Sequence, residues 1–265
     1  RKFVMTKIIE KATSLLSEGT VKMIIGYEMG TERPRPLFCH TAEECEKLIM
    51  NAECKNNLAV YLTKKEIIGE EKIAVIGNYF VVKTVIQLHR ENQVNLENLM
   101  VMTADENGEV ITFTTIDEMQ EYVDTHEPAP NPKMVAALEK IDKMSREERW
   151  EYWKSELSKC IRCYACRAAC PLCYCNRCVT EVNCPQWIEP WAAPLSNMEW
   201  QINRVMHMSG RCVGCGECAA ACPLDLPIGL LCKKMGMDIK STFGEWKDGN
   251  VLSTYNIGDK ENFIK

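Results

Sequence analysis

The sequence contains no uninterrupted apolar stretch of about 18 residues, so we expect no segment of it to span a membrane. It opens with no signal-peptide pattern. It has no Ser/His/Asp order and no paired carboxylates that would indicate acid–base or nucleophilic catalysis. A glycine-rich phosphate loop is also missing, because Gly26-x3-Gly30 alone is too weak a signal. These absences argue against side-chain catalysis and against a nucleotide-binding loop.

The sequence also lacks a large excess of charge of either sign. The chain has 32 Lys and Arg residues against 37 Asp and Glu residues, which gives a net charge of −5 at pH 7. This mildly acidic balance gives no support to nucleic-acid binding and little to binding at an anionic membrane surface.

Cysteine, in contrast, is abundant. Of the 16 cysteines, 13 fall between Cys160 and Cys232. Such a density would indicate disulfides in a small secreted protein, but the signal-peptide pattern is missing. Metal-binding thiolates need reducing conditions, so we expect a cytoplasmic protein of an anaerobic organism.

Two copies of one cysteine run account for eight of these residues. Each copy reads C-x2-C-x2-C-x3-C-P, the run of bacterial ferredoxins that hold two 4Fe-4S clusters. The first copy begins at Cys160 and ends at Pro171, and the second begins at Cys212 and ends at Pro223. Proline after the fourth cysteine ends the local helix and turns the chain away from the metal.

In this run the first three cysteines hold one cluster and the fourth reaches the other cluster. The predicted ligands are Cys160, Cys163, Cys166 and Cys222 for cluster I, and Cys212, Cys215, Cys218 and Cys170 for cluster II. Gly214 and Gly216 leave no side chain where the backbone must lie close to sulfur. Zinc sites usually combine separated pairs of ligands, so two complete four-cysteine runs favour iron–sulfur clusters.

A further set of cysteines lies in the insertion 171–211 between the two runs. Its members are Cys173, Cys175, Cys178 and Cys184. They could hold a third 4Fe-4S cluster or a tetrahedral zinc ion, because both take four thiolates. Alternatively they are buried thiols without metal.

The remaining candidate residues are interpreted as structural. Cys39, Cys45 and Cys54 have no ligand spacing, and Cys232 is expected to lie beside cluster I. His207 is expected to be a capping or packing residue on a helix. The rings of Trp187, Trp191 and Trp200 are expected to cover the clusters and keep water away from them, with a partner-docking surface as the alternative.

Residues 1–126 alternate short apolar runs with amphipathic segments. We expect buried strands at 21–27, 58–62, 73–77 and 99–103, an edge strand at 110–115, and helices at 7–16, from Thr41, at 81–90 and at 116–123. This alternation predicts an α/β domain with a mostly parallel sheet.

A proline-rich joint begins at His126. Residues before proline avoid the helical region, so this joint is expected to be extended. The predicted organisation is an α/β domain at 1–126, the joint and two helices (134–143 and 146–158) at 127–158, a two-cluster ferredoxin-like domain at 159–232, and a tail at 233–265. The overall fold class is therefore an α/β domain joined to a ferredoxin-like domain with an inserted Cys-rich loop.

The block from Lys159 to Cys218, with its Cys-Pro-Leu-Cys-Tyr-Cys and Pro-Gln-Trp phrases, resembles the iron–sulfur β subunits of deazaflavin-dependent formate dehydrogenases and hydrogenases. It is also similar to dicluster subunits of heterodisulfide-reductase-linked complexes. The resemblance covers residues 145–245 well and the α/β part more weakly. It implies membership of a redox complex whose other subunits are a flavoprotein, formate dehydrogenase, hydrogenase or heterodisulfide-reductase-like.

The chain departs from those relatives at two places. They are expected to carry a Gly-Cys-Asp phrase after the strand at 73–76 and a Pro-Cys phrase near residue 103. This chain has Gly77-Asn78-Tyr79 and Met102-Thr103-Ala104 instead. We therefore expect it to bind no flavin or nicotinamide, and residues 1–126 to be a degenerate docking domain.

The sequence thus predicts an electron-transfer subunit that relays single electrons through 4Fe-4S clusters, without a catalytic residue of its own. Two alternatives stay open. In the first, the α/β domain binds flavin and the subunit oxidises or reduces a soluble cofactor. In the second, the clusters are a structural scaffold and do not change oxidation state during turnover.

Overall fold

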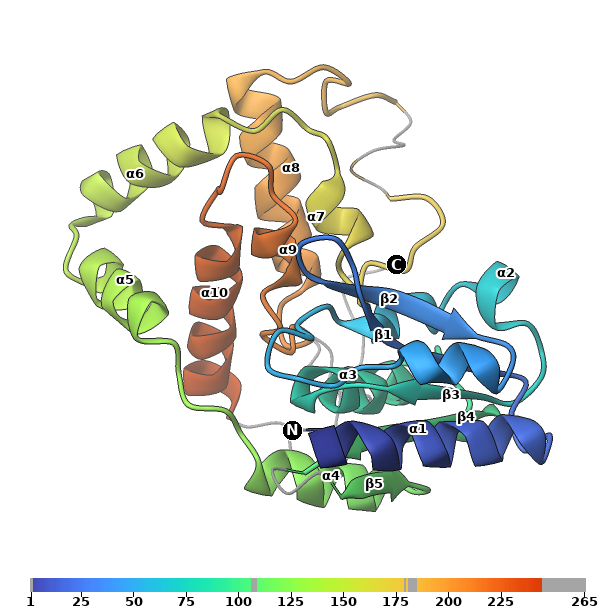
Figure 1. Ribbon diagram of the computed structural model, residues 1–265. Helices are drawn as coiled ribbons and strands as arrows, with labels where there is room; N and C mark the ends of the chain where they lie inside the picture. Colours follow the sequence, from blue (N-terminus) through green and yellow to red (C-terminus); the bar gives the residue numbers. More distant parts are fainter. Residues whose placement is uncertain (1, 106–108, 179, 181–184, 245–265) are drawn as a thin grey trace, which may run out of the picture. The chain divides into compact units, whose positions relative to one another are not determined.

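A computed structural model of the chain describes residues 2–105, 109–178, 180 and 185–244 (Figure 1). The chain divides into two compact units. The first contains residues 1–129 and 167–174, and the second contains residues 130–166 and 175–265. The boundary at Ala129 falls inside the proline-rich joint.

The first unit is built on a five-stranded sheet of order β2-β1-β3-β4-β5. Its strands are β1 (Met23–Met29), β2 (Pro34–Cys39), β3 (Ile73–Ile76), β4 (Leu99–Ala104) and β5 (Val110–Phe113). The three central strands run parallel, and each edge strand pairs antiparallel with its neighbour. The expected mostly parallel sheet is therefore confirmed in its centre.

Helices cover both faces of this sheet (Figure 1). The helices of this unit are α1 (Lys2–Ser17), η1 (Glu43–Lys47), η2 (Leu58–Tyr61), α2 (Lys65–Ile68), α3 (Tyr79–Arg90), η3 (Leu96–Asn98) and α4 (Ile116–Thr125). On one face, Ile8, Ala12 and Leu15 of α1 pack against buried residues of the strands, among them Ile24 and Ile76. Successive side chains of a strand point to opposite faces of the sheet, so only every second residue of each strand can face α1.

Two sequence expectations in this unit are wrong. The apolar run at 58–62 is the 3₁₀ helix η2 and not a strand, and Asn57 caps it by accepting from the amide of Ala59. Short apolar runs do not distinguish a buried strand from a buried helical turn. The helix expected from Thr41 is only the 3₁₀ turn η1, because the next residues leave to make an antiparallel bridge between Ile49 and Tyr27.

Strand β2 was not expected from the sequence. It contains Pro34 and Pro36, which pair with Met29 and Tyr27 at the edge of the sheet. Proline has no N–H group and cannot donate a hydrogen bond to a neighbouring strand, so it is tolerated in an edge strand such as β2.

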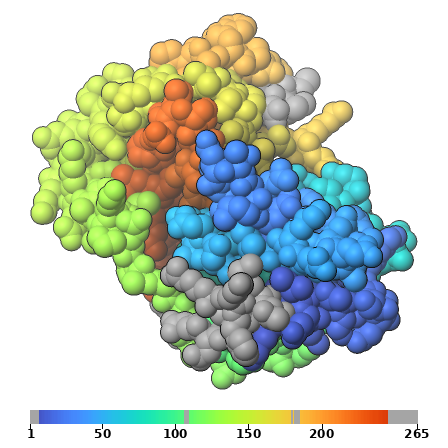
Figure 2. All heavy atoms as spheres, in the orientation of Figure 1, coloured from blue at the N-terminus to red at the C-terminus, as the bar shows by residue number. Residues whose placement is uncertain are grey.

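The second unit is helical. Its helices are α5 (Pro132–Asp142), α6 (Arg146–Ser158), α7 (Ala165–Ala168, whose last two residues belong to the first unit), α8 (Pro194–His207), α9 (Glu217–Ala220) and α10 (Ile228–Phe243). Helix α6 packs mainly on α8, and α10 contacts α5, α8 and α9. Residues of α5 and α6 form much of the surface visible in yellow-green in Figure 2.

The helices expected at 134–143 and 146–158 are α5 and α6, and Ser145 and Glu148 form the expected capping box of α6. The segment expected as a tail begins differently. Helix α10 continues past Cys232 to Phe243, so the first part of 233–265 is helical. Residues 245–265 lie outside the described part of the chain.

The two units can be followed separately in solution, because all six tryptophans lie within residues 150–246. We expect anaerobic removal of iron with a chelator to lower the stability of the second unit more than that of the first, since metal binding contributes to folding free energy and all predicted ligands of clusters I and II except Cys170 lie in the second unit. Urea titration should then show tryptophan fluorescence changing before the far-UV circular dichroism of the sheet. A single shared transition in the iron-free chain would contradict independent units.

Candidate metal centre

Four of the predicted ligands meet in one pocket of the second unit. Cys160, Cys163 and Cys166 of the first run line it together with Cys222, the fourth cysteine of the second run. Apolar residues complete the wall, among them Trp200, Leu226 and Ile228. The crossing expected for cluster I, in which the fourth ligand comes from the other run, is the arrangement that this pocket has.

The two runs also repeat each other in backbone conformation. Arg162 and Tyr164 have positive φ angles of 53° and 59°, and the residues 52 positions later, Gly214 and Gly216, have 77° and 80°. A short helix contains the third cysteine of each run, Cys166 in Ala165–Ala168 and Cys218 in Glu217–Ala220. The same left-handed turns therefore shape both loops, once with glycine and once without.

Positive φ is unfavourable for residues other than glycine, at a cost of roughly 1–3 kcal/mol each. In the first run this conformation lets the amide of Arg162 donate to Sγ of Cys160 at 3.3 Å. The guanidinium of Arg162 is buried and donates to the carbonyls of Glu189 and Trp191 and to the hydroxyl of Tyr164. These bonds hold the strained loop in place.

The three predicted shielding rings differ in their surroundings. Trp200 is buried, and its ring packs edge to face against the ring of Tyr164, with the ring centroids 4.9 Å apart. Trp187 and Trp191 are 50% and 63% exposed. Among the described residues that line the pocket, Trp200 is the one tryptophan, and the expected shielding by Trp187 and Trp191 stays a prediction.

The second run brings its sulfurs towards Cys232. Hydrogen bonds to Cys212 and Cys218, together with burial, raise the pKa of the Cys232 thiol. A hydrogen bond from Cys232 and the nearby guanidinium of Arg204 lower the pKa of the Cys218 thiol. Cys232 also belongs to the apolar cluster that contains Cys160 and Cys166. It therefore lies beside the first run, as expected, and beside the second run as well.

Cys215 is half-buried in the second unit, whereas Cys170 lies in the segment 167–174 that belongs to the first unit. This segment is fixed there by the hydroxyl of Tyr174, which donates to Oε2 of Glu91 at 2.8 Å. The turn after Cys170 resembles the turn after Cys222, because each cysteine carbonyl accepts from the amide three residues later.

The third set of cysteines is divided between the units. Cys173 belongs to the first unit, Cys175 and Cys178 belong to the second, and Cys184 lies outside the described residues. Sγ of Cys178 lies 3.0 Å from Oγ1 of Thr180 and packs against the apolar cluster of Cys160 and Cys166. A third cluster or a zinc ion here stays a prediction.

A single metal ion and a cubane cluster require different distances between their ligands. Thiolates lie about 2.3 Å from a zinc ion, so four of them crowd together, whereas each thiolate of a cubane binds a different iron. Within the described ranges, no group of three or more His, Cys, Asp or Glu side chains is close enough to hold one metal ion. Four thiols around one pocket, with N–H groups aimed at Cys160, form a donor set that fits a 4Fe-4S cubane.

The other cysteines are ordinary core residues. Burial raises the pKa of the Cys39, Cys45 and Cys54 thiols. A buried thiol with a raised pKa is unreactive, because the thiolate is the reactive form. His207 is exposed at the last position of α8. None of the four needs a role in metal binding.

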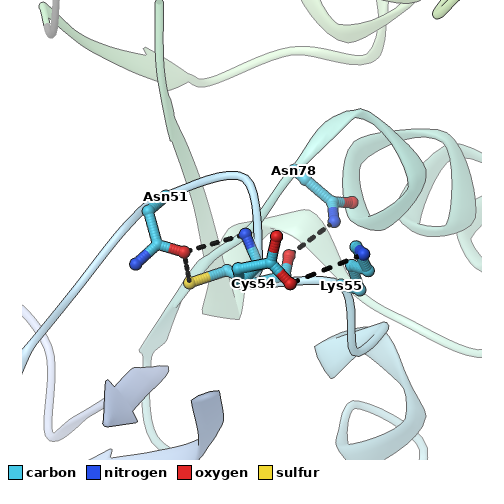
Figure 3. Close-up of polar contacts among 5 residues, drawn as sticks. Asn51, Cys54, Lys55 and Asn78 are labelled. Atoms are coloured by element: carbon cyan, nitrogen blue, oxygen red, sulfur yellow. Dashed lines mark hydrogen bonds and ion pairs between the residues drawn. The ribbon is translucent and has the colours of Figure 1, made fainter. Parts of the chain in front are cut away.

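Asn78 stands where a cysteine was expected in related chains, directly after β3. Its carbonyl oxygen accepts from the amides of Phe80 and Val81 and caps α3, while its amide donates to the carbonyl of Cys54 at 3.0 Å (Figure 3). The same loop is held by Asn51, whose side chain lies 3.6 Å from Sγ of Cys54. Asn78 thus joins the carboxyl end of β3 to the loop at 51–55.

No helix in the described segments combines the length and the apolarity needed to cross a bilayer.

Comparison with known proteins points to the same residues. Residues 206–226, which contain the second run, match the family model of the 4Fe-4S binding domain. The chain is 35% identical over 75 residues to the F420-dependent formate dehydrogenase subunit beta of Methanocaldococcus jannaschii. That alignment covers 28% of this chain and 19% of the relative. The family match supports 4Fe-4S binding, and the alignment confirms the resemblance to such β subunits over part of the chain.

The pocket predicts the effect of removing its only ligand from the second run. We expect Cys222→Ser to damage the cluster on Cys160, Cys163 and Cys166 and to leave the other cluster intact, with roughly half of the iron lost. Iron analysis and electron paramagnetic resonance of the reduced chain would measure this. Cys39→Ser is the matched control and should keep all iron. Loss of the second run's signal instead would contradict the crossing.

Proposed function

We propose that this chain is an electron-transfer subunit that relays single electrons through two 4Fe-4S clusters between redox partners in a multi-subunit oxidoreductase complex. Cluster I would be held by Cys160, Cys163, Cys166 and Cys222, and cluster II by Cys212, Cys215, Cys218 and Cys170. The observation that supports this most strongly is the pocket in which cysteines of both runs meet.

A 4Fe-4S cluster supplies one-electron chemistry with little change of shape. The chain itself contributes the thiols, the amide of Arg162 on Cys160, and the ring of Trp200. Hydrogen bonds to sulfur and exclusion of water are the means by which a protein adjusts such a centre. Relaying electrons needs no acid, base or nucleophile, and we propose no catalytic residue.

Part of the wall of this pocket is exposed at the surface. Cys163 is exposed, and so are the neighbouring Ile161 and Leu224, which also line the pocket. Electron transfer between proteins requires a redox group close to the surface that docks. Cluster I is therefore proposed as the point where an electron enters or leaves the chain.

The setting is proposed from the relative's name. A formate dehydrogenase β subunit works with at least one other subunit, so a partner of this chain would be a formate dehydrogenase, hydrogenase, flavoprotein or heterodisulfide-reductase-like subunit. The first unit would serve as the docking domain for such a subunit. An anaerobic cytoplasm suits the exposed Cys163 and Cys212, which oxygen would attack.

An anaerobic redox titration of the full chain tests this function. We expect two one-electron reductions per chain, and Cys170→Ser should remove the signal assigned to the second run while keeping that of the first. Cys54→Ser, which changes a buried thiol of the first unit, is the control. Clusters that stay oxidised at every accessible potential would support a structural scaffold, and a flavin signal would support a flavin-binding oxidoreductase subunit. Either result would overturn the proposal.

A further inference from the structure

Helix α8 presents a row of polar side chains to the interior of the second unit. Asn197, Gln201 and Arg204 are spaced by four and three residues, so they share one helix face, and they are 2%, 1% and 3% exposed. Burying amides and above all a guanidinium is costly unless they are hydrogen-bonded. A buried polar row of this kind therefore needs partners in the interior.

Two of these side chains donate to the first cysteine run. Nδ2 of Asn197 donates to the carbonyl of Cys160 at 2.6 Å, which fixes the backbone of the loop. Nε2 of Gln201 donates to Sγ of Cys160 at 3.6 Å, and Gln201 also lies beside the thiol of Cys166. Gln201 thus acts on sulfurs of the first run.

Arg204 reaches both runs. Its Nη2 donates to the carbonyl of Cys166 at 3.0 Å. Its guanidinium also lies beside Cys218 in the second run, where its charge lowers the pKa of that thiol. Arg204 therefore places one buried positive charge beside one ligand of each proposed cluster.

We propose that Arg204 sets the reduction potentials of both clusters together. This inference rests on the proposed function. A cluster gains one negative charge when it is reduced, and a buried cation beside its ligands stabilises that charge more than a neutral amide does. Removing the charge lowers both potentials, whereas removing the amide of Gln201, which donates to a sulfur of the first run, affects cluster I alone.

The direction of electron transfer between the two clusters depends on the difference between their reduction potentials. A charge shared by both clusters raises both reduction potentials and changes the difference between them little. Gln201, which donates to a sulfur of the first run, then adjusts that difference. Arg204 is a positioning and potential-setting residue, and it makes no bond to the metal.

The experiment compares redox titrations of the full chain carrying Arg204→Gln, Arg204→Met, Arg204→Lys or Gln201→Leu. Signals are assigned with Cys163→Ser and Cys215→Ser, one from each run, and iron per chain is measured for every variant. We expect both neutral Arg204 variants to lower the reduction potentials of both clusters. The equilibrium constant for each one-electron reduction should fall at least tenfold, which corresponds to 59 mV. Arg204→Lys keeps the positive charge and should keep both potentials close to those of the wild-type chain. Gln201→Leu should change the potential of cluster I only.

Arg146→Gln removes an exposed arginine of the same unit and is the matched control, expected to leave both potentials unchanged because water and salt screen its charge. Unchanged potentials in fully loaded Arg204→Gln would overturn the inference, and so would a shift of one cluster only. If neither neutral variant binds iron while Arg204→Lys does, the residue serves assembly and the inference is wrong. Failure of the proposed function would differ, because the wild-type chain itself would hold no reducible cluster.

Discussion

The second unit depends on one constraint: sulfur atoms from two runs that begin 52 residues apart, at Cys160 and Cys212, must face the same small volume. Cys222 meets Cys160, Cys163 and Cys166 only because both runs fold into the same loop, with left-handed turns at equivalent positions. The second run meets this requirement with Gly214 and Gly216. The first meets it with Arg162 and Tyr164, whose conformational cost is offset by hydrogen bonds and ring packing.

Helix α8 supplies what surrounds this volume. One of its faces carries Trp200, which excludes water, and beside it the amides and the guanidinium that reach the cysteine loops. A buried guanidinium is an expensive choice for a core position. Its position becomes understandable if the interior holds negative charge, which thiolate-ligated clusters provide.

Local patterns in the sequence were sufficient for much of this structure. The spacing of the cysteines, the helical period of α3 and the capping box of α6 all depend on residues near one another in the chain. The prediction failed where distant contacts decide the conformation. The bridge between Ile49 and Tyr27 ends the turn at η1, and pairing with β1 makes a strand of the proline-containing β2. The roles of Gln201 and Arg204 were missed for the same reason, because their partners lie 41 and 38 residues away.

The central claim is that the redox groups of this chain are iron–sulfur clusters held by its two cysteine runs. Its most direct test is the content of iron, acid-labile sulfide, zinc and flavin in the anaerobically purified chain. The account predicts about eight irons and eight sulfides per chain with no flavin, and about twelve irons if Cys173, Cys175, Cys178 and Cys184 hold a third cluster. Zinc in place of iron, or one flavin per chain, would contradict it.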